Sequence, residues 1–496
     1  MPVFSQEAYY WTYAQHPDLS YFDHPPLVAW LIWLGTALFG DGSIGIRLGT
    51  WLCGVGTTWL CALQLKAFGL DRRAQSLGVL ATLALPILSM THFLANPDAP
   101  LVLFWTLTVY ALWQARGGSL SWWLLAGGAA GGALLGKYSA AFLAVGGVAV
   151  LALDPRMRAQ LRRPGPYVAV FVAVCVFLPV IAWNVRNDFE SFRFQTEDRY
   201  ARGELGWRWF LETVLEQASV FHPLAALLLP VALVWLGRRW RTDARTLWLL
   251  AFGLPLPAYL LFSSLWIQVK INWFAPAYVP LVMALVVWWS EARPHWATGR
   301  PFRLARWSLL CVPLAMVLGP LLMRIVPPGK GSSWMGWDQV AARAEFWEDE
   351  VDVRDGIEGN VFFFAADYRD SAQLGRSLSR LWASEGEHHV VTSGPDGGEP
   401  TLAQNVLGQK ALQFDHWTAP RSRIGQHAIF VLPRPEGREE MVQKATARFE
   451  RIEKMERVHV ASLGITLFDA DIYTCYGYRG PGPAAPNDSE AGRHSR

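Results

Sequence analysis

The chain has 496 residues, of which 52% are hydrophobic and 17% are charged, and it contains 26 tryptophans. Its net charge of +3 is small and dispersed, which argues against nucleic acid as a partner, and the cysteines lie mostly inside apolar runs, so no disulfide framework is indicated. Because the apolar residues stand in long runs rather than in an amphipathic scatter, the composition predicts a polytopic membrane protein.

The segment from Gln6 to Leu27 reads QEAYYWTYAQHPDLSYFDHPPL and holds no lysine or arginine. It is acidic and aromatic, and a helix is expected to begin near Ala8. The apolar stretch 27–39 that follows is too short to cross a bilayer, so we expect an interfacial or re-entrant helix. Residues 1–42 are therefore predicted to form an external loop that carries catalytic groups.

An external loop at the beginning of the chain needs a membrane-crossing segment ahead of it. Residues 1–5 are too short to supply one. We therefore expect that a first membrane helix is missing from this chain, which an in-frame apolar stretch of about 20 codons upstream would reveal.

Windows of about 20 residues, matched to a hydrocarbon core of about 30 Å, mark apolar segments along the first two thirds of the chain. Two of them meet at Lys137 and could instead form one long helix. A lysine at the bilayer centre costs roughly 2.5 to 3.5 kcal/mol, and only a turn at Lys137 keeps the basic loops on one side, as the positive-inside rule requires. We predict the turn, and with it spans at 43–65, 74–92, 98–115, 120–135, 138–153, 167–184, 217–237, 246–265, 274–290 and 307–325.

This topology predicts a multi-pass protein of the bacterial inner membrane whose active site and C-terminal domain are periplasmic. The membrane domain is expected to cover residues 1–326, followed by a small α/β domain at 327–480 and a disordered tail at 481–496. In the α/β domain, GNVFFFAADY, HAIFVL and GITLFDADIYTCYGY are expected to form strands, SAQLGRSLSRLWAS an amphipathic helix, and EEMVQKATARFERIEKM (439–455) a charged helix. Segments expected on the outer face are residues 1–42, the turn Asn96-Pro97-Asp98, Lys137, the loop 185–216, the turn 266–273 and everything after Pro327.

Six motifs carry a resemblance to a known family: QEAYYW, YFDHPPL, NPDAPLVLFW, GKYSA, KINWFAPAY and LGQKALQFDHW. In this order they resemble motifs of bacterial members of the protein O-mannosyltransferase-like superfamily, glycosyltransferase family 39, which includes the lipid A aminoarabinose transferase. The resemblance covers residues 6 to about 480. It implies a GT-C fold and an inverting glycosyltransferase that moves a sugar from a polyprenyl-phosphate donor to an envelope lipid, glycan or protein at the outer face. Relatives usually begin the first motif with Asp-Glu, whereas this chain has Gln6-Glu7.

The chemistry of such a transfer explains which residues it needs. Displacing a lipid phosphate from a sugar carbon passes through an oxocarbenium-like state, and the phosphate leaves without a general acid. One carboxylate must take the proton of the acceptor hydroxyl, and Glu7 is the candidate base, with Asp98 as a second catalytic carboxylate facing it from another loop.

Cationic groups are expected to stabilise the charge that grows on the phosphate. Lys137 is the main candidate. The resemblance places His24 where the aminoarabinose transferase has a phosphate-binding lysine. The remaining candidates are Arg199, Arg202 and Lys270 for the phosphate, and Gln6, Tyr9, Tyr10 and Asp23 for the rest of the site loop.

Each candidate has a structural alternative. Glu7 could cap a helix start, His24 could hydrogen-bond to backbone in a rigid turn before Pro25-Pro26, and Asp98 could cap the helix that begins at Ala99-Pro100. Lys137 could extend its ammonium to the membrane interface. The arginines at 186, 193, 199, 202 and 208 could form a solvated loop face.

Two other functional classes stay open. A transporter would place its polar groups near the bilayer midplane, and a catalytically inactive GT-C relative would fit the replacement at Gln6. No cofactor is assigned, although Glu7 with Asp98 could hold a divalent cation such as Mg²⁺ or Mn²⁺ through oxygen ligands.

Overall fold

The computed structural model describes residues 2–198, 205–292, 307–325, 334–355, 361–385, 405–408, 411–417 and 420–481. The chain forms two compact units: one is Pro17–Pro320, and the other joins Met1–His16 with Leu321–Arg496. The sequence had placed residues 1–42 together and the domain boundary at 326. The structure divides that first segment at His16, because helix α1 (Ser5–Gln15) packs against α20 (Tyr368–Glu385) of the C-terminal part.

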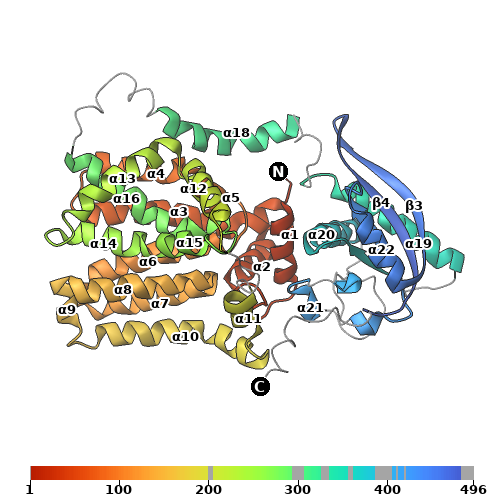
Figure 1. Ribbon diagram of the computed structural model, residues 1–496, viewed down its shortest axis with the longest axis horizontal. Helices are drawn as coiled ribbons and strands as arrows, with labels where there is room; N and C mark the ends of the chain where they lie inside the picture. Colours follow the sequence, from red (N-terminus) through yellow and green to blue (C-terminus); the bar gives the residue numbers. More distant parts are fainter. Residues whose placement is uncertain are drawn as a thin grey trace. The chain divides into compact units, whose positions relative to one another are not determined.

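The unit Pro17–Pro320 is built from helices (Figure 1). Helices α6, α7 and α10 lie side by side, and α14 packs on α8 and α16. The elements are α2 (Leu27–Phe39), α3 (Ser43–Ala67), α4 (Arg72–Ala84), α5 (Pro86–Phe93), α6 (Asp98–Ala115), α7 (Leu120–Gly136), η1 (Tyr138–Ala141), α8 (Phe142–Leu153), α9 (Pro155–Gln160), α10 (Gly165–Arg186), α11 (Glu190–Arg193), η2 (Phe194–Asp198), α12 (Trp207–Val220), α13 (Pro223–Gly237), α14 (Ala244–Gly253), α15 (Pro255–Ser263), η3 (Ile271–Phe274), α16 (Ala275–Ala292), η5 (Ser308–Leu310) and α18 (Cys311–Ile325), which runs into the second unit.

Within the described residues, three segments are long and apolar enough to cross a membrane: Gly165–Arg186, Ala244–Ser263 and Ile271–Ala292. Two bent helix pairs, α4 with α5 and α12 with α13, raise the number to five if each pair is one span. Each of the ten apolar segments marked from the sequence coincides with one of the helices or with a broken pair.

Two of those segments are broken where a single helix was expected. Helices α4 and α5 meet at Pro86 with a bend of 72°, and α12 and α13 meet at His222 with a bend of 107°. Proline removes a backbone donor and clashes with the preceding turn, and His222 adopts a positive φ of 69° just before Pro223. The expected turn at Lys137 is confirmed as a helix break, since α7 ends at Gly136 and Lys137 is extended.

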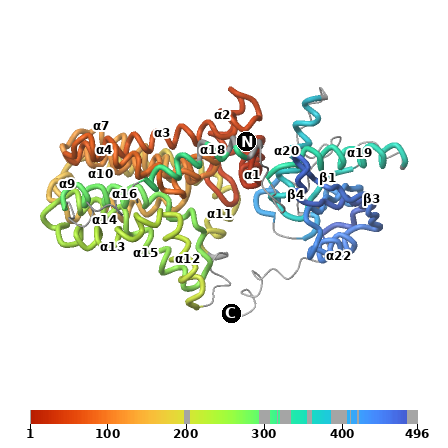
Figure 2. Tube along the Cα trace, turned by 90° about the horizontal axis from the view of Figure 1, so that it is seen from above, coloured from red at the N-terminus to blue at the C-terminus, as the bar shows by residue number. Residues whose placement is uncertain are grey.

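The second unit contains a four-stranded sheet of order β1-β2-β4-β3, in which β1 and β2 are parallel and the other pairs antiparallel. Helices α19 and α20 cover one face and α22 covers the other (Figure 2). The strands are β1 (Val361–Ala365), β2 (His427–Pro433), β3 (Phe449–Ser462) and β4 (Ile465–Tyr478), and the remaining helices are α19 (Trp337–Asp355), η6 (Asn405–Leu407), α21 (Phe414–Trp417), η7 (Pro420–Arg423) and α22 (Glu439–Arg448).

The strands β1, β2 and β4 and helix α20 confirm the elements expected from sequence in the C-terminal domain. The long charged helix expected over residues 439–455 was wrong in its second half, where β3 begins at Phe449. Phe449 pairs with Tyr478 of β4 and stacks on Phe364 of β1, so the sheet takes residues that the local charge pattern assigned to a helix. The tail predicted to be disordered lies, from residue 482 onward, outside the described residues.

Candidate functional site

Asp98 stands at the centre of a buried polar cluster in the unit Pro17–Pro320. It opens α6 and is 1% exposed. Its Oδ1 accepts a hydrogen bond from Lys137 Nζ at 2.8 Å, and its Oδ2 accepts one from Asn272 Nδ2. Lys137 follows α7 and Asn272 lies in η3, so three separate turns converge on one carboxylate.

The cluster joins two residues that the sequence singled out and one that it missed. Asp98 and Lys137 are brought together as an ion pair. Asn272 was overlooked, although it lies inside the KINWFAPAY motif. An amide with one carboxylate partner has no charge pattern of its own, so the motif was the only signal that could have found it.

The capping alternative for Asp98 is wrong, because Asn96 does the capping. The Oδ1 atom of Asn96 accepts from the backbone N–H of Asp98 at 2.9 Å and of Ala99 at 3.2 Å. Asparagine is among the preferred residues for satisfying the donors at a helix start. The carboxylate of Asp98 is thereby available to Lys137.

The side chain of Lys137 does not simply extend its ammonium to the membrane interface. Its side chain is 11% exposed and its ammonium contacts Asp98 rather than extending to water. An ammonium carries three N–H donors, of which Asp98 takes one. The pair therefore keeps the capacity to donate hydrogen bonds to an anion while the buried charge stays balanced.

The first loop, from Pro17 to Pro26, is held by the last turn of α10 and by the segment that follows it. Gln195 Nε2 donates to the backbone oxygen of Asp23 at 2.8 Å, and Trp183 Nε1 donates to Asp18 Oδ2 at 2.9 Å. The same segment reaches the turn beside Lys137, since the hydroxyls of Tyr138 and Ser191 lie 2.7 Å apart. The loops expected on the outer face are thus linked to one another inside this unit.

Asp23 and His24 form a second polar pair on this loop. Asp23 is buried, and its Oδ2 lies 3.7 Å from His24 Nε2. The carbonyl of His24 accepts the N–H of Tyr21 at 3.2 Å, which closes the expected turn before the two prolines. The rigid turn is therefore present, and both roles considered for the His24 side chain, hydrogen bonding to backbone and phosphate binding, stay predictions.

Among the described residues, the side-chain partners of Asp98 are Lys137 and Asn272, and the other cationic candidates lie elsewhere or are not described. Lys270 is exposed and stands directly before η3. Arg186, Arg193 and Arg208 are exposed, as a solvated loop face requires. Arg199 and Arg202 lie outside the described residues.

Glu7 belongs to the other unit, where it lies in the first turn of α1. Its Oε2 accepts the backbone N–H of Phe4 at 2.8 Å, and the residue is 1% exposed. The capping role expected of Glu7 is therefore confirmed. Capping does not exclude catalysis, because a carboxylate can accept several hydrogen bonds.

Two other candidates on α1 contact the C-terminal part of the unit. Gln6 Oε1 accepts from Tyr368 at 3.4 Å, and the Tyr9 hydroxyl accepts the N–H of Gln413 at 3.2 Å. Successive residues of a helix are turned by about 100°, so Gln6 and Tyr9 lie about 60° apart, and Tyr10 lies between Gln6 and Glu7, about 40° from the first and about 60° from the second.

His16, just after α1, carries no charge that could attract a phosphate near neutral pH. Burial lowers the pKa of His16 to about 4, and its ring packs on Trp417 with centroids 4.7 Å apart. The aromatic contact is the role that the structure supports for this residue.

No group of three His, Cys, Asp or Glu side chains that could hold a metal ion occurs among the described residues. Glu7 and Asp98, the pair considered for a divalent cation, belong to different units. Metal dependence stays a matter for experiment.

Comparison with known proteins places these residues in context. Residues 23–183 match the family model of dolichyl-phosphate-mannose-protein mannosyltransferase. The chain is 30% identical over 327 residues to the lipid A galacturonosyltransferase RgtD of Rhizobium johnstonii, covering 64% of this chain and 65% of that protein. It is 29% identical over 317 residues to the undecaprenyl phosphate-α-4-amino-4-deoxy-L-arabinose arabinosyl transferase 1 of Pseudomonas fluorescens, covering 59% and 52%. The chain thus spans less than two thirds of the length of these relatives.

Solved structures extend the likeness to the fold. The crystal structure of ArnT from Cupriavidus metallidurans in the apo state matches with a TM-score of 0.60 at 16% identity, covering 95% of this chain and 94% of that one. The same protein bound to undecaprenyl phosphate matches with a TM-score of 0.57. The chain has a GT-C fold and is similar in sequence to the aminoarabinose transferases. The expected fold class, a multi-pass helical membrane protein with a small C-terminal α/β domain, is confirmed, as is the resemblance drawn from the motifs.

Some candidate residues lie inside the segment that matches the family model, and others lie outside it. It contains Asp23, His24, Asp98 and Lys137, whereas Glu7 precedes it. Asn272 and Lys270 follow it. The Asp98 cluster therefore combines two residues of the family segment with one from a later turn.

Proposed function

We propose that this chain is an inverting glycosyltransferase that moves a sugar from a polyprenyl-phosphate donor to a lipid A-type acceptor at the periplasmic face of the inner membrane. The observation that carries the proposal is the buried cluster of Asp98, Lys137 and Asn272, which holds a cation at the junction of three turns. Relatives named for undecaprenyl phosphate and lipid A support the choice of substrates.

Lys137 is assigned to the donor phosphate. The ammonium donates to the phosphate oxygens as the bond to the sugar breaks, and it stabilises the growing negative charge. Asp98 holds the ammonium in place, and Asn272 holds the carboxylate. Because both oxygens of Asp98 already accept hydrogen bonds, we assign it a positioning role in place of the catalytic role expected from sequence.

Glu7 is assigned the role of general base. It takes the proton of the acceptor hydroxyl while that oxygen attacks the anomeric carbon from the side opposite the phosphate. The carbon–oxygen bond to the phosphate breaks, the lipid phosphate leaves with the electron pair, and the configuration inverts. Lys137 supplies fixed positive charge for this step, so we expect turnover to persist in EDTA; loss that Mg²⁺ or Mn²⁺ restores would assign that ion a part in the reaction.

The test uses the purified full chain with lipid A and two donors, undecaprenyl-phosphate aminoarabinose and a polyprenyl-phosphate galacturonic acid. We expect release of free lipid phosphate and a matching mass increase of lipid A with one of them. Lys137→Ala should weaken use of the donor, whereas Arg208→Ala, an exposed cation paired with Glu212, should not.

Other outcomes point to other classes. A mass increase on an envelope glycan or protein instead of lipid A would reassign the acceptor. Uptake of a solute into proteoliposomes without any lipid phosphate release would indicate a transporter. Absence of both activities would favour the inactive GT-C relative.

A further inference from the structure

Helix α1 is held along one face by the C-terminal part of its own unit. The Tyr9 hydroxyl accepts hydrogen bonds from Tyr13 at 3.0 Å and from the backbone N–H of Gln413 at 3.2 Å. One turn earlier, Tyr368 donates to Gln6 at 3.4 Å. The first residue of α20 and the segment before α21 therefore contribute to one set of contacts around α1, which we call the clamp.

Aromatic rings reinforce the clamp at Tyr9. This residue is fully buried, and its ring meets Tyr368 edge-on at 4.7 Å and lies 6.0 Å from Phe414. Such pairs contribute beyond the area that they bury. Tyr9 is thus fixed both by its hydroxyl and by its ring.

The clamp extends beyond both ends of the helix. Before α1, Gln373 Nε2 donates to the backbone oxygen of Val3 at 2.8 Å in a buried contact. After α1, the His16 ring packs on Trp417. The helix cannot rotate or slide without breaking several of these contacts at once.

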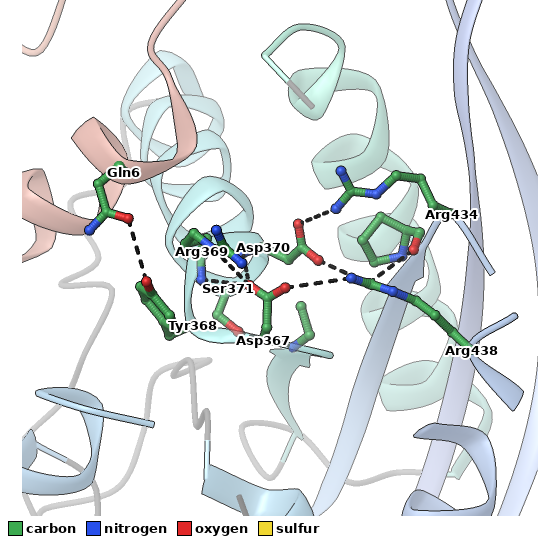
Figure 3. A network of polar contacts seen from close by, with 10 residues as sticks. Gln6, Asp367, Tyr368, Arg369, Asp370, Ser371, Arg434 and Arg438 are labelled. Atoms are coloured by element: carbon green, nitrogen blue, oxygen red, sulfur yellow. Dashed lines mark hydrogen bonds and ion pairs between the residues drawn. The ribbon is translucent and has the colours of Figure 1, made fainter. Parts of the chain in front are cut away.

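The partner surface is itself anchored to the sheet (Figure 3). Tyr368 begins α20, and in the same turn Asp367 Oδ1 accepts the N–H of Asp370 at 3.1 Å. The buried carboxylate of Asp370 accepts from Arg434 at 2.8 Å and from Arg438 at 3.1 Å, both of which follow β2. The turn that contacts Gln6 is therefore tied to the end of a central strand.

Glu7 lies away from the clamped face. With about 100° per residue, Gln6, Tyr9 and Tyr13 fall within an arc of roughly 60°, and Glu7 lies about 130° from the centre of that arc. The contacts of the clamp therefore hold α1 from a side other than that of Glu7.

We propose that the C-terminal α/β part of the chain positions the candidate base, and that Tyr9 is the central positioning residue. A base must be held to within a fraction of an ångström of its proton, and an isolated helix of 11 residues is only marginally stable in water. The clamp supplies the rigidity that α1 alone would lack. This inference rests on the proposed function.

The clamp is tested by hydrogen exchange of the α1 amides in the full protein. Tyr9→Phe keeps the ring and removes the acceptor for the Gln413 N–H, and Gln373→Ala removes an independent contact. We expect exchange in α1 to rise about tenfold in each, with exchange in α7 unchanged. Tyr167→Phe, whose hydroxyl donates to Leu161 on an exposed helix end, is the matched control.

The positioning role is tested by kinetics on the same variants. We expect Tyr9→Phe to lower kcat about tenfold while KM for the donor changes less than twofold, because the donor does not depend on α1 alone for binding. Unchanged α1 exchange in both variants overturns the clamp, and raised exchange with unchanged kcat overturns the positioning role. If the wild-type protein releases no lipid phosphate, the proposed function itself is contradicted. The wild-type assay shows this before any variant is tested.

Discussion

Asp98 and Glu7 are both 1% exposed carboxylates, yet their surroundings differ. Asp98 contacts Lys137 and Asn272, side chains 39 and 174 positions away in the sequence. Glu7 accepts a backbone N–H only three residues away. The first carboxylate joins distant turns of the helical unit, whereas the second sits on a helix that other residues hold in place.

This difference assigns the two carboxylates to different tasks. Removing a buried charge that two side chains bind lowers the free energy of unfolding strongly, and such a fixed group suits a positioning role. A carboxylate that caps its own helix can be replaced by the amide of the same shape, whose oxygen still accepts the same backbone N–H. The comparison therefore predicts opposite outcomes when each charge is removed.

The largest expected effect is on turnover in Glu7→Gln. Loss of a general base lowers kcat by about 10² to 10⁴, while the amide oxygen can still accept the Phe4 N–H, so thermal stability should change little. Lipid phosphate release and a thermal melt on one preparation measure both, with Glu212→Gln as control. Retention of most of the turnover would place the base elsewhere.

Removing the charge of Asp98 should affect stability first. Asp98→Ala leaves Lys137 as a buried cation without its carboxylate, which typically costs about 3 to 5 kcal/mol. Lys137→Ala should cost a similar amount, and the double substitution should cost less than the sum of the two. Additive losses in detergent unfolding would show that the ion pair contributes little.

Asp370 should make the stability of the C-terminal unit depend on pH. Burial, with a contribution from Asp367, raises the pKa of Asp370 from 3.8 to about 6, although Arg434 and Arg438 oppose the shift. Its stabilising contribution is therefore fully present below about pH 4 and is lost as pH rises through 6.

The check compares wild type with Asp370→Asn, which cannot titrate at this position. The free energy of unfolding of the wild type minus that of the variant should fall by about 2 to 3 kcal/mol between pH 4 and pH 7. Asp338→Asn, at an exposed carboxylate, should show no such slope. A difference that is flat or rises with pH would contradict the assignment.

Asn96→Ala should weaken the start of α6. Two backbone N–H groups lose the side-chain oxygen that accepts them, a loss of about 1 kcal/mol for a typical cap. Thermal unfolding measures it, and a loss as large as that of Asp98→Ala would mean that the turn supports the whole cluster.

The smallest effect is expected for Gln6→Asp. Relatives usually have an aspartate at the position of Gln6. If the base acted from this position, the new Asp carboxylate would raise turnover. Because Gln6 contacts Tyr368 on the clamped face, we expect kcat to stay within about twofold of the wild type. A marked gain in kcat would move the base from Glu7 to position 6.

The sequence by itself determined the helices, the break at Lys137 and the family resemblance. Apolar runs and prolines act over one or two turns, so local composition is sufficient to predict where α2 or α7 ends. The same locality explains the errors. Residues 449–455 look helical by charge, but pairing with β4 makes them a strand.

Only the tertiary structure decided which candidates act together. Asn272 joins Asp98 across 174 positions, and Tyr368 meets Gln6 across 362. It also decided that α1 belongs to the C-terminal unit. Such contacts depend on packing between elements that are distant in the sequence, and local sequence patterns do not predict it.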